Sequence, residues 1–278
     1  MYRPFIVQQA QAGKRPLRWF YQLLSLGSYD LSQKAMSYDR KWIFTLAVIG
    51  IPAAHGLHGY IGFVFGSLKA REWWSSDLMP LVFLFSAIIS GTALLIVIYV
   101  LSCRLRKVPV DLPCLKGMAY ALWGFMMFTL LLEGVEFASL VYRGREGIEI
   151  IMEYVRGPLL ITFFVLQFCV GSVIPLTLLS YMIWRGTSGR ALVAGVTTCA
   201  TLVLFAVLMM RWNVVIGGQE IAKTGKGLVD YQPTIGGREG LLAAASLVVM
   251  PLILLSLAVK LFPPWEKRLT PSPETNAS

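Results

Sequence analysis

The chain has 278 residues, of which 56% are hydrophobic and 14% are charged. About a quarter of the residues of a soluble domain are charged, so this composition excludes an ordinary water-soluble globular fold. The net charge of +10 could suggest nucleic acid, but the basic residues lie between apolar stretches and at the two ends. They form no basic stripe interleaved with base-stacking aromatic side chains, and no nucleic-acid partner is expected.

The first 41 residues are basic throughout and lack the compact apolar core of a cleavable signal peptide. Aromatic and leucine side chains from Trp19 to Leu24 stand beside Arg15 and Arg18, as in a short helix that lies among lipid headgroups. An irregular tail packed on a partner fits the same residues. We expect residues 1–41 to form a cytoplasmic, interfacial segment.

Six apolar stretches follow, each long enough to cross a bilayer at a rise of about 1.5 Å per residue. They cover residues 42–66, 78–102, 117–142, 157–184, 190–212 and 240–262. Most connections are short, which predicts antiparallel neighbours in a bundle. The Gly-rich segment 213–239 is expected to fold over one face of the membrane.

The predicted fold class is therefore all-α, a polytopic transmembrane helical bundle of about six spans. Its domains are the interfacial segment 1–41, the membrane domain 42–262 and a disordered cytoplasmic tail at 263–278. With both termini in the cytoplasm, 16 of the 25 Lys and Arg residues lie on the cytoplasmic side. The positive-inside rule favours this orientation.

Ionisable side chains inside apolar stretches are energetically costly in hydrocarbon, so their presence indicates a functional or structural role. In the predicted topology they gather near the non-cytoplasmic face, within about 15 Å of it at helical rise. They are His58 in the first stretch, Glu133 and Glu136 in the third and Arg211 at the end of the fifth, with Asp77 beside the second. His55 with His58, and Glu133 with Glu136, are spaced i, i+3 and share a helix face.

Imidazole, carboxylate and guanidinium groups around a slot between helices suit a ligand that exchanges electrons together with protons, such as a quinone. We predict a quinone site, with Glu133 and Glu136 also transferring protons. Its residues are His58, His55, Asp77, Glu133, Glu136 and Arg211. Structural roles are the alternative: a histidine bonded to a helix carbonyl, or a glutamate paired with Arg211.

Neither haem nor metal is expected in this chain. A haem with two histidine ligands needs them on facing helices, whereas the two histidines, His55 and His58, share one helix. The cysteines form no CxxC motif and lie in or beside apolar stretches, where a free cysteine packs as a small hydrophobe. They are Cys103, Cys114, Cys169 and Cys199.

Two runs of residues together resemble a known family. The first joins the run from Ile51 to Gly59 with Trp73-Trp74, Met79-Pro80 and the run from Phe85 to Gly91. The second, from Arg211 to Gln219, is similar to the family's late Arg-x-Asn signature. Over about residues 40–262 the chain resembles the NrfD-like family of polysulfide-reductase type membrane subunits. Members usually have eight or more spans, and six are predicted here.

The resemblance implies a haem-free, quinone-interacting subunit of a multi-subunit respiratory oxidoreductase, which is not active alone. Such a subunit exchanges electrons between the quinone pool, menaquinone or ubiquinone, and a ferredoxin-like iron–sulfur subunit. A molybdopterin or multihaem cytochrome catalytic subunit would complete the complex, in a bacterial or archaeal cytoplasmic (inner) membrane. His58 matches the family's quinone-site histidine by its spacing to Trp73 and Pro80, and His55 is a weaker match.

Two other functions use the same residues. A secondary transporter or proton-translocating protein could relay protons through Glu133, Glu136, His58 and Arg211. No inverted repeat, the usual mark of a transporter, is evident in the sequence. A membrane anchor whose polar groups only hold helices together is the remaining alternative.

Overall fold

The computed structural model describes residues 2–12, 15–71, 73–143, 148–157, 159–222, 227–229, 231, 233–237 and 240–262. Helices account for nearly all of the regular structure in these ranges. They are α1 (Arg3–Ala12), α2 (Arg15–Ser25), α3 (Gln33–Gly66), α4 (Met79–Leu105), α5 (Leu112–Arg143), α6 (Ile148–Arg156), the π-helix η1 (Leu160–Val173), α7 (Ile174–Trp184), α8 (Gly189–Trp212), the π-helix η2 (Asn213–Gly217), α9 (Gly218–Glu220) and α10 (Leu241–Leu261).

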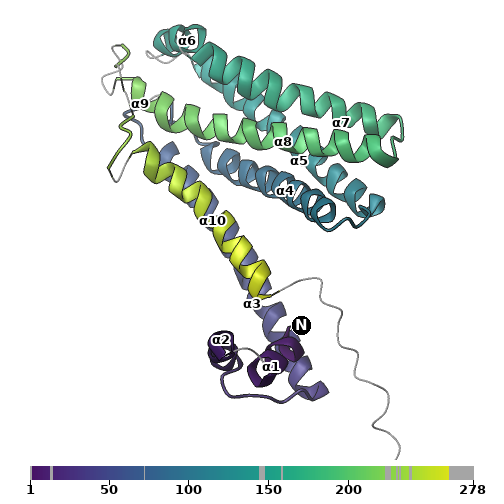
Figure 1. Cartoon of the computed structure of the whole chain (residues 1–278). Helices are drawn as coiled ribbons and strands as arrows, with labels where there is room; N and C mark the ends of the chain where they lie inside the picture. The colour runs from purple at the N-terminus through teal and green to yellow at the C-terminus, as the bar shows by residue number, and fades with distance from the viewer. Residues whose placement is uncertain are drawn as a thin grey trace, which may run out of the picture. The chain divides into compact units, whose positions relative to one another are not determined.

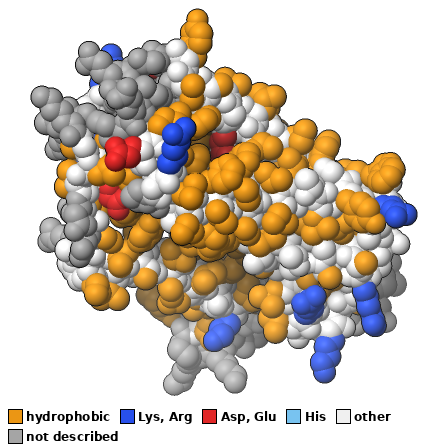
Figure 2. All heavy atoms as spheres, turned by 90° about the horizontal axis from the view of Figure 1, so that it is seen from above, with side chains coloured by type: hydrophobic (Ala, Val, Ile, Leu, Met, Phe, Trp, Pro, Cys, Tyr) orange, Lys and Arg blue, Asp and Glu red, His pale blue; other side chains and the backbone are white. Residues whose placement is uncertain are grey.

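Six helices in the described ranges are long and apolar enough to cross a membrane. They are α3, α4, α5 as far as Ser139, η1 with α7, α8 as far as α9, and α10. Hydrophobic side chains form a broad band on the face shown in Figure 2, as lipid-facing helices require. The predicted all-α, polytopic fold is confirmed. The predicted disordered tail, residues 263–278, lies outside the described residues.

The described residues divide into two compact units. The first contains the described residues of 1–52 and 233–262, and the second contains those of 53–232. In the first unit, helix α2 carries the residues predicted to form an interfacial helix. The hydroxyl of Tyr21 in α2 donates to the carbonyl oxygen of Leu261, at the end of α10, at 2.6 Å. This bond fastens the N-terminal helices to the last helix of the same unit.

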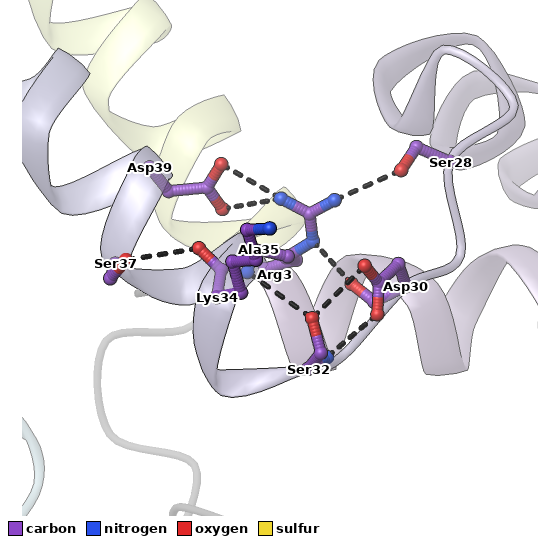
Figure 3. A network of polar contacts seen from close by, with 8 residues as sticks. All are labelled: Arg3, Ser28, Asp30, Ser32, Lys34, Ala35, Ser37 and Asp39. Carbon is purple, nitrogen blue, oxygen red and sulfur yellow. Dashed lines mark hydrogen bonds and ion pairs between the residues drawn. The ribbon is translucent and has the colours of Figure 1, made fainter.

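Polar contacts around Arg3 organise the start of the first unit (Figure 3). The Arg3 guanidinium pairs with the Asp39 carboxylate at 2.8 Å and donates to the Asp30 carbonyl oxygen at 2.7 Å and to Ser28 Oγ at 2.9 Å. Asp30 accepts a hydrogen bond from the Ser32 backbone N–H, and hydrogen bonding from Ser32 lowers the pKa of the Asp30 carboxyl. The network joins α1 to the start of α3.

In the second unit, α4, α5, α7 and α8 pack side by side as a bundle (Figure 1). Residues of all four helices are fully or almost fully buried where the late part of α4 meets the early part of α8. This dry core includes Ala93, Ile96, Val100, Leu115, Leu122, Leu179, Val196, Cys199 and Ala200. Small residues at such contacts let helix backbones approach closely, which favours helix association in lipid.

Two glycines mark close helix contacts in this unit. A Cβ atom on Gly62, in α3, would lie 2.6 Å from the carbonyl oxygen of Met79. A side chain on Gly171, in η1, would collide with Ala206 of α8. Larger residues at these positions would force the helices apart, so glycine sets both contact distances.

The fifth spanning helix is longer than predicted. It was expected to end at residue 212, but η2 and α9 extend it to Glu220. The side chains of Trp73 and Trp74, in the connection between α3 and α4, donate to the carbonyl oxygens of Asn213 and Val214 at 3.2 and 2.5 Å. These donors satisfy carbonyl groups at the irregular turn, which explains how helical structure continues into a segment that the sequence marks as a loop.

Candidate functional site

A cavity of about 340 Å³ lies at the end of the bundle where α4 begins and where α5 and α8 finish. Its wall comes from the connection before α4, the late part of α5, η1, and the junction of α8 with η2. Apolar side chains such as Met79, Val82 and Phe163 make up much of this wall. The volume and the apolar lining with a few polar groups are typical of a small-molecule site.

Three of the predicted site residues line this cavity: Asp77, Glu133 and Glu136. The two glutamates are one helical turn apart on α5, as their spacing predicted, and both are partly buried. The Ser76 hydroxyl donates a hydrogen bond to the Glu136 carboxylate. A carboxylate in an apolar wall needs such donors, or a proton. The cavity therefore presents acid groups suited to a ligand that carries hydrogen-bond donors.

Arg211 is close to the cavity but does not line it. Its Nη2 donates to Ser86 Oγ at 2.9 Å, and its guanidinium carbon lies 4.2 Å from the centre of the Phe83 ring. Among the described residues, no ion pair joins Arg211 to Glu133 or Glu136. The structural alternative in which an arginine neutralises one of these glutamates is therefore not what the structure shows.

The two histidines do not line the cavity either. His58 Nδ1 lies 3.0 Å from the carbonyl oxygen of Ala54, four residues earlier on α3, and donates to it in the tautomer protonated at Nδ1. His55 is exposed on the same helix. The ligand-binding role of both histidines stays a prediction without a cavity contact to support it.

Two carboxamides that we did not predict as site residues also line the cavity. Asn213 Nδ2, in η2, donates to Gln167 Oε1, in η1, at 2.9 Å, and both residues are almost fully buried. Gln167 is the one carboxamide in its apolar stretch. A polar residue in an apolar stretch is the same signal that led to the prediction of Glu133 and Glu136. Asn213 stood in the late signature, but nothing in the sequence indicated its partner.

A second, smaller cavity of about 40 Å³ adjoins the first. The side chains of Glu133, Gln167 and Met210 line both cavities and form the wall between them. Thr129 also lines the small cavity, and its buried Oγ1 has no hydrogen-bond partner among the described residues. The small cavity has a mostly apolar lining with a few polar groups, and its volume is large enough for a water molecule, which needs about 10 to 15 Å³ of accessible volume.

Helix α6 packs close to the same end of the bundle. The Tyr154 hydroxyl donates to the Glu220 carboxylate, at the end of α9. The pKa of the Tyr154 phenol is raised mainly by burial and, to a smaller extent, by the hydrogen bond to Glu220. Arg71 donates to the carbonyl oxygens of Gly218 and Ile221 at 2.6 and 2.9 Å. These contacts fix the end of α8 and its extension, which carries Met210, Asn213 and Val214 to the cavity.

Comparison with known proteins identifies the family. The family model described as "Polysulphide reductase, NrfD" matches residues 7–222, more than half of the chain. The chain belongs to the NrfD family. The resemblance given by the two sequence runs is thereby confirmed, and an NrfD membrane protein agrees with the six apolar helices.

Two relatives of this NrfD protein carry functional names. A selenate reductase subunit of Mesobacillus selenatarsenatis is 27% identical over 281 residues, which cover 96% of this chain and 63% of the relative. A putative dimethyl sulfoxide reductase membrane subunit of Halobacterium salinarum is 34% identical over 90 residues, which cover 32% of this chain and 21% of the relative. The chain thus spans less than two thirds of the length of either relative. Both names describe subunits of reductases.

No cluster of three or more potential metal ligands occurs among the residues that the structure describes. The four cysteines are free thiols, and they range from exposed, at Cys114, to buried, at Cys199. Polar side chains on the cavity wall include Asp77, Glu133, Glu136, Gln167 and Asn213.

Proposed function

We propose that this NrfD protein is a haem-free, quinone-interacting membrane subunit of a respiratory oxidoreductase, in which a menaquinone or ubiquinone binds in the 340 Å³ cavity. The observation that carries the proposal is an apolar cavity with Asp77, Glu133 and Glu136 on its wall, built by membrane-spanning helices. An apolar ring needs such walls, and its two oxygens need a few polar partners.

The chemistry of the ligand explains the acid groups. A hydroquinone that is oxidised to a quinone loses two electrons and two protons. The protons need nearby bases that can pass them to water, which is the role that we assign to Glu133 and Glu136. In the reverse direction, the same groups would supply the protons. Asp77, in the connection before α4, is assigned a hydrogen-bonding role at the ligand.

The electrons need an acceptor outside the ligand. We assign this role to a ferredoxin-like iron–sulfur subunit, with a molybdopterin or multihaem cytochrome subunit carrying out the terminal reaction. The names of the two relatives, both reductase subunits, support a multi-subunit reductase of this kind. We further propose a bacterial or archaeal inner membrane with both termini in the cytoplasm, which places the cavity near the non-cytoplasmic face.

His58, His55 and Arg211 hold a secondary place in this proposal. Arg211 is in the turn that joins two cavity residues, Met210 and Asn213, so its contacts with Ser86 and Phe83 help to position them. The histidines are one turn apart on α3, and we keep them as proposed quinone-binding residues although neither lines the cavity.

The test uses membranes that contain the assembled complex, with the hydroquinone of 2-methyl-1,4-naphthoquinone as electron donor. Glu133→Gln and Glu136→Gln should each lower turnover by about 100-fold, the effect of losing a general acid–base group. Glu153→Gln is the matched control, because Glu153 is an exposed carboxylate on α6 that does not line the cavity. Co-purification of the partner subunits shows that the variants assemble.

Normal turnover in both glutamate variants would overturn the proposed site. A wild-type complex that does not react with hydroquinone, together with glutamate variants that lose proton transport, would instead favour the transporter. Full activity of all three variants in an intact complex would support the alternative in which the chain is only a membrane anchor.

A further inference from the structure

The two π-helical segments of the second unit meet at a pair of carboxamides. Gln167 belongs to η1 and Asn213 to η2. Their side chains are joined by the 2.9 Å hydrogen bond from Asn213 Nδ2 to Gln167 Oε1, and both residues line the main cavity. π-Helical turns are rare and often occur at functional sites. Here residues of two such segments line one cavity.

The backbone of each carboxamide residue is held by a side-chain donor. The Ser172 hydroxyl donates to the carbonyl oxygen of Gln167, and Trp73 Nε1 donates to that of Asn213, both at 3.2 Å. Gln167 is 5% exposed and Asn213 is 1% exposed. The pair is therefore positioned by three elements, η1, η2 and the connection before α4.

A count of hydrogen bonds leaves the pair incomplete. The bond between two carboxamides uses one N–H and one carbonyl oxygen, and it leaves one NH₂ group and one carbonyl oxygen for other partners. Among the described residues, Asn213 Oδ1 is buried without a partner, and the NH₂ group of Gln167 makes no hydrogen bond. If both amides turned over together, the remaining groups would again be one donor and one acceptor. The pair therefore has one free NH₂ group and one free carbonyl oxygen in either orientation of the two amides.

We propose that the Gln167–Asn213 pair binds one ring oxygen of the quinone ligand and distinguishes its redox states. This inference rests on the proposed function. A hydroquinone hydroxyl can donate to the pair's carbonyl oxygen and accept from its NH₂ group, whereas a quinone carbonyl can only accept. Because Asn213 Oδ1 is buried, this binding mode requires the Asn213 side chain to turn its oxygen toward the cavity that the residue lines. The pair makes two bonds to the reduced form and one to the oxidised form.

Direct binding measurements on the purified full chain in lipid nanodiscs test the proposal. The probes are 2-methyl-1,4-naphthoquinone and, under anaerobic conditions, its hydroquinone. Quenching of tryptophan fluorescence reports binding, because Trp73 lines the cavity. The quantity of interest is the selectivity, defined as the Kd of the quinone divided by the Kd of the hydroquinone.

Two variants should move the selectivity in opposite directions. The double variant Gln167→Met with Asn213→Leu removes both amides, and replacing both partners by apolar groups of similar size can be nearly neutral for stability. It should lower the selectivity roughly tenfold, since the hydroquinone loses one bond more than the quinone. Asn213→Asp accepts a hydrogen bond from Gln167 and presents a carboxylate oxygen to the ligand. Because the hydroquinone hydroxyl then makes a stronger, charge-assisted bond and the quinone carbonyl finds no donor, this variant should raise the selectivity by roughly tenfold.

Thr129→Val is the matched control. Thr129 carries the other buried polar atom without a described partner, but it lines the small cavity instead of the main one. Its selectivity should stay within about twofold of the wild-type value. A selectivity unchanged in both amide variants, in a wild-type chain that binds the probes, overturns this inference alone. Failure of the wild-type chain to bind either probe overturns the proposed function as well.

Discussion

At one end of the bundle in the second unit, residues such as Ala93, Leu122 and Cys199 are completely buried and apolar. At the other end, the same helices α4, α5 and α8 surround a cavity with carboxylates and carboxamides on its wall. The helix backbone is regular at the first end and π-helical at the second, where side chains of Arg71, Trp73 and Trp74 satisfy freed carbonyl groups. The comparison assigns stability mainly to the dry end, and our proposal assigns ligand binding to the polar end.

The largest effect on stability is expected in the dry core. Leu122→Ala should lower the free energy of unfolding by about 2 to 5 kcal/mol, because it leaves a void among residues of four helices. Leu131→Ala, on the same helix but 62% exposed, is the control and should cost less than about 0.5 kcal/mol. Reversible unfolding in mixed micelles measures both. A Leu122→Ala variant that keeps its stability but loses naphthoquinone binding would contradict the division between the two ends.

A smaller effect is expected where α6 contacts the end of α9. Tyr154→Phe removes a hydrogen bond to a carboxylate and should cost about 1.5 to 3 kcal/mol of unfolding free energy. The pKa of Tyr154 is raised in the folded protein, so its contribution is fully present below the unfolded-state pKa of about 10 and disappears only as the pH rises through the higher folded-state pKa.

The stability difference between wild type and Tyr154→Phe should therefore be the same at pH 6 and at pH 9. Tyr142→Phe, which alters a tyrosine that is 92% exposed, serves as the control. A difference that shrinks between these two pH values would show that the phenol already ionises in this range.

The smallest effect is expected at the indole donors of the irregular turn. Trp74→Phe removes the hydrogen bond to the Val214 carbonyl oxygen and keeps an aromatic ring beside Phe65, so it should cost about 1 kcal/mol of unfolding free energy. Hydrogen exchange should quicken at the amides of η2 and α9. Trp184→Phe, at a residue that is 82% exposed, should leave exchange there unchanged. Unaltered exchange in Trp74→Phe would mean that η2 does not depend on this donor.

Much of the fold followed from the sequence because hydrocarbon imposes a simple rule on length and polarity. The six apolar stretches correspond to six helices, and the i, i+3 spacing placed Glu133 and Glu136 on one wall. Local patterns failed where distant contacts decide the structure. The sequence of the Gly-rich run after Trp212 predicts a loop. In the structure its first residues are helical, and two indoles about 140 residues away in sequence donate to the carbonyl oxygens of Asn213 and Val214.

The site was harder to predict than the fold for the same reason. The pairing of Gln167 with Asn213 joins residues 46 positions apart, and no local spacing encodes it. Arg211 was placed at the correct end of its helix, but its side chain bonds to Ser86 instead of lining the cavity. Depth along a helix is readable from sequence, whereas the direction of one side chain depends on neighbouring helices.

Photoaffinity labelling with an azido-naphthoquinone tests the central claim, that the polar end of the bundle holds the quinone ligand. The purified chain in nanodiscs would be irradiated with the probe, and the labelled peptides would be sequenced. We expect label in residues 73–79, 133–139, 163–167 or 210–214, and suppression of that label by excess unlabelled hydroquinone. Label confined to the dry core or to the helix around His55 and His58, with none of these four segments modified, would contradict the account.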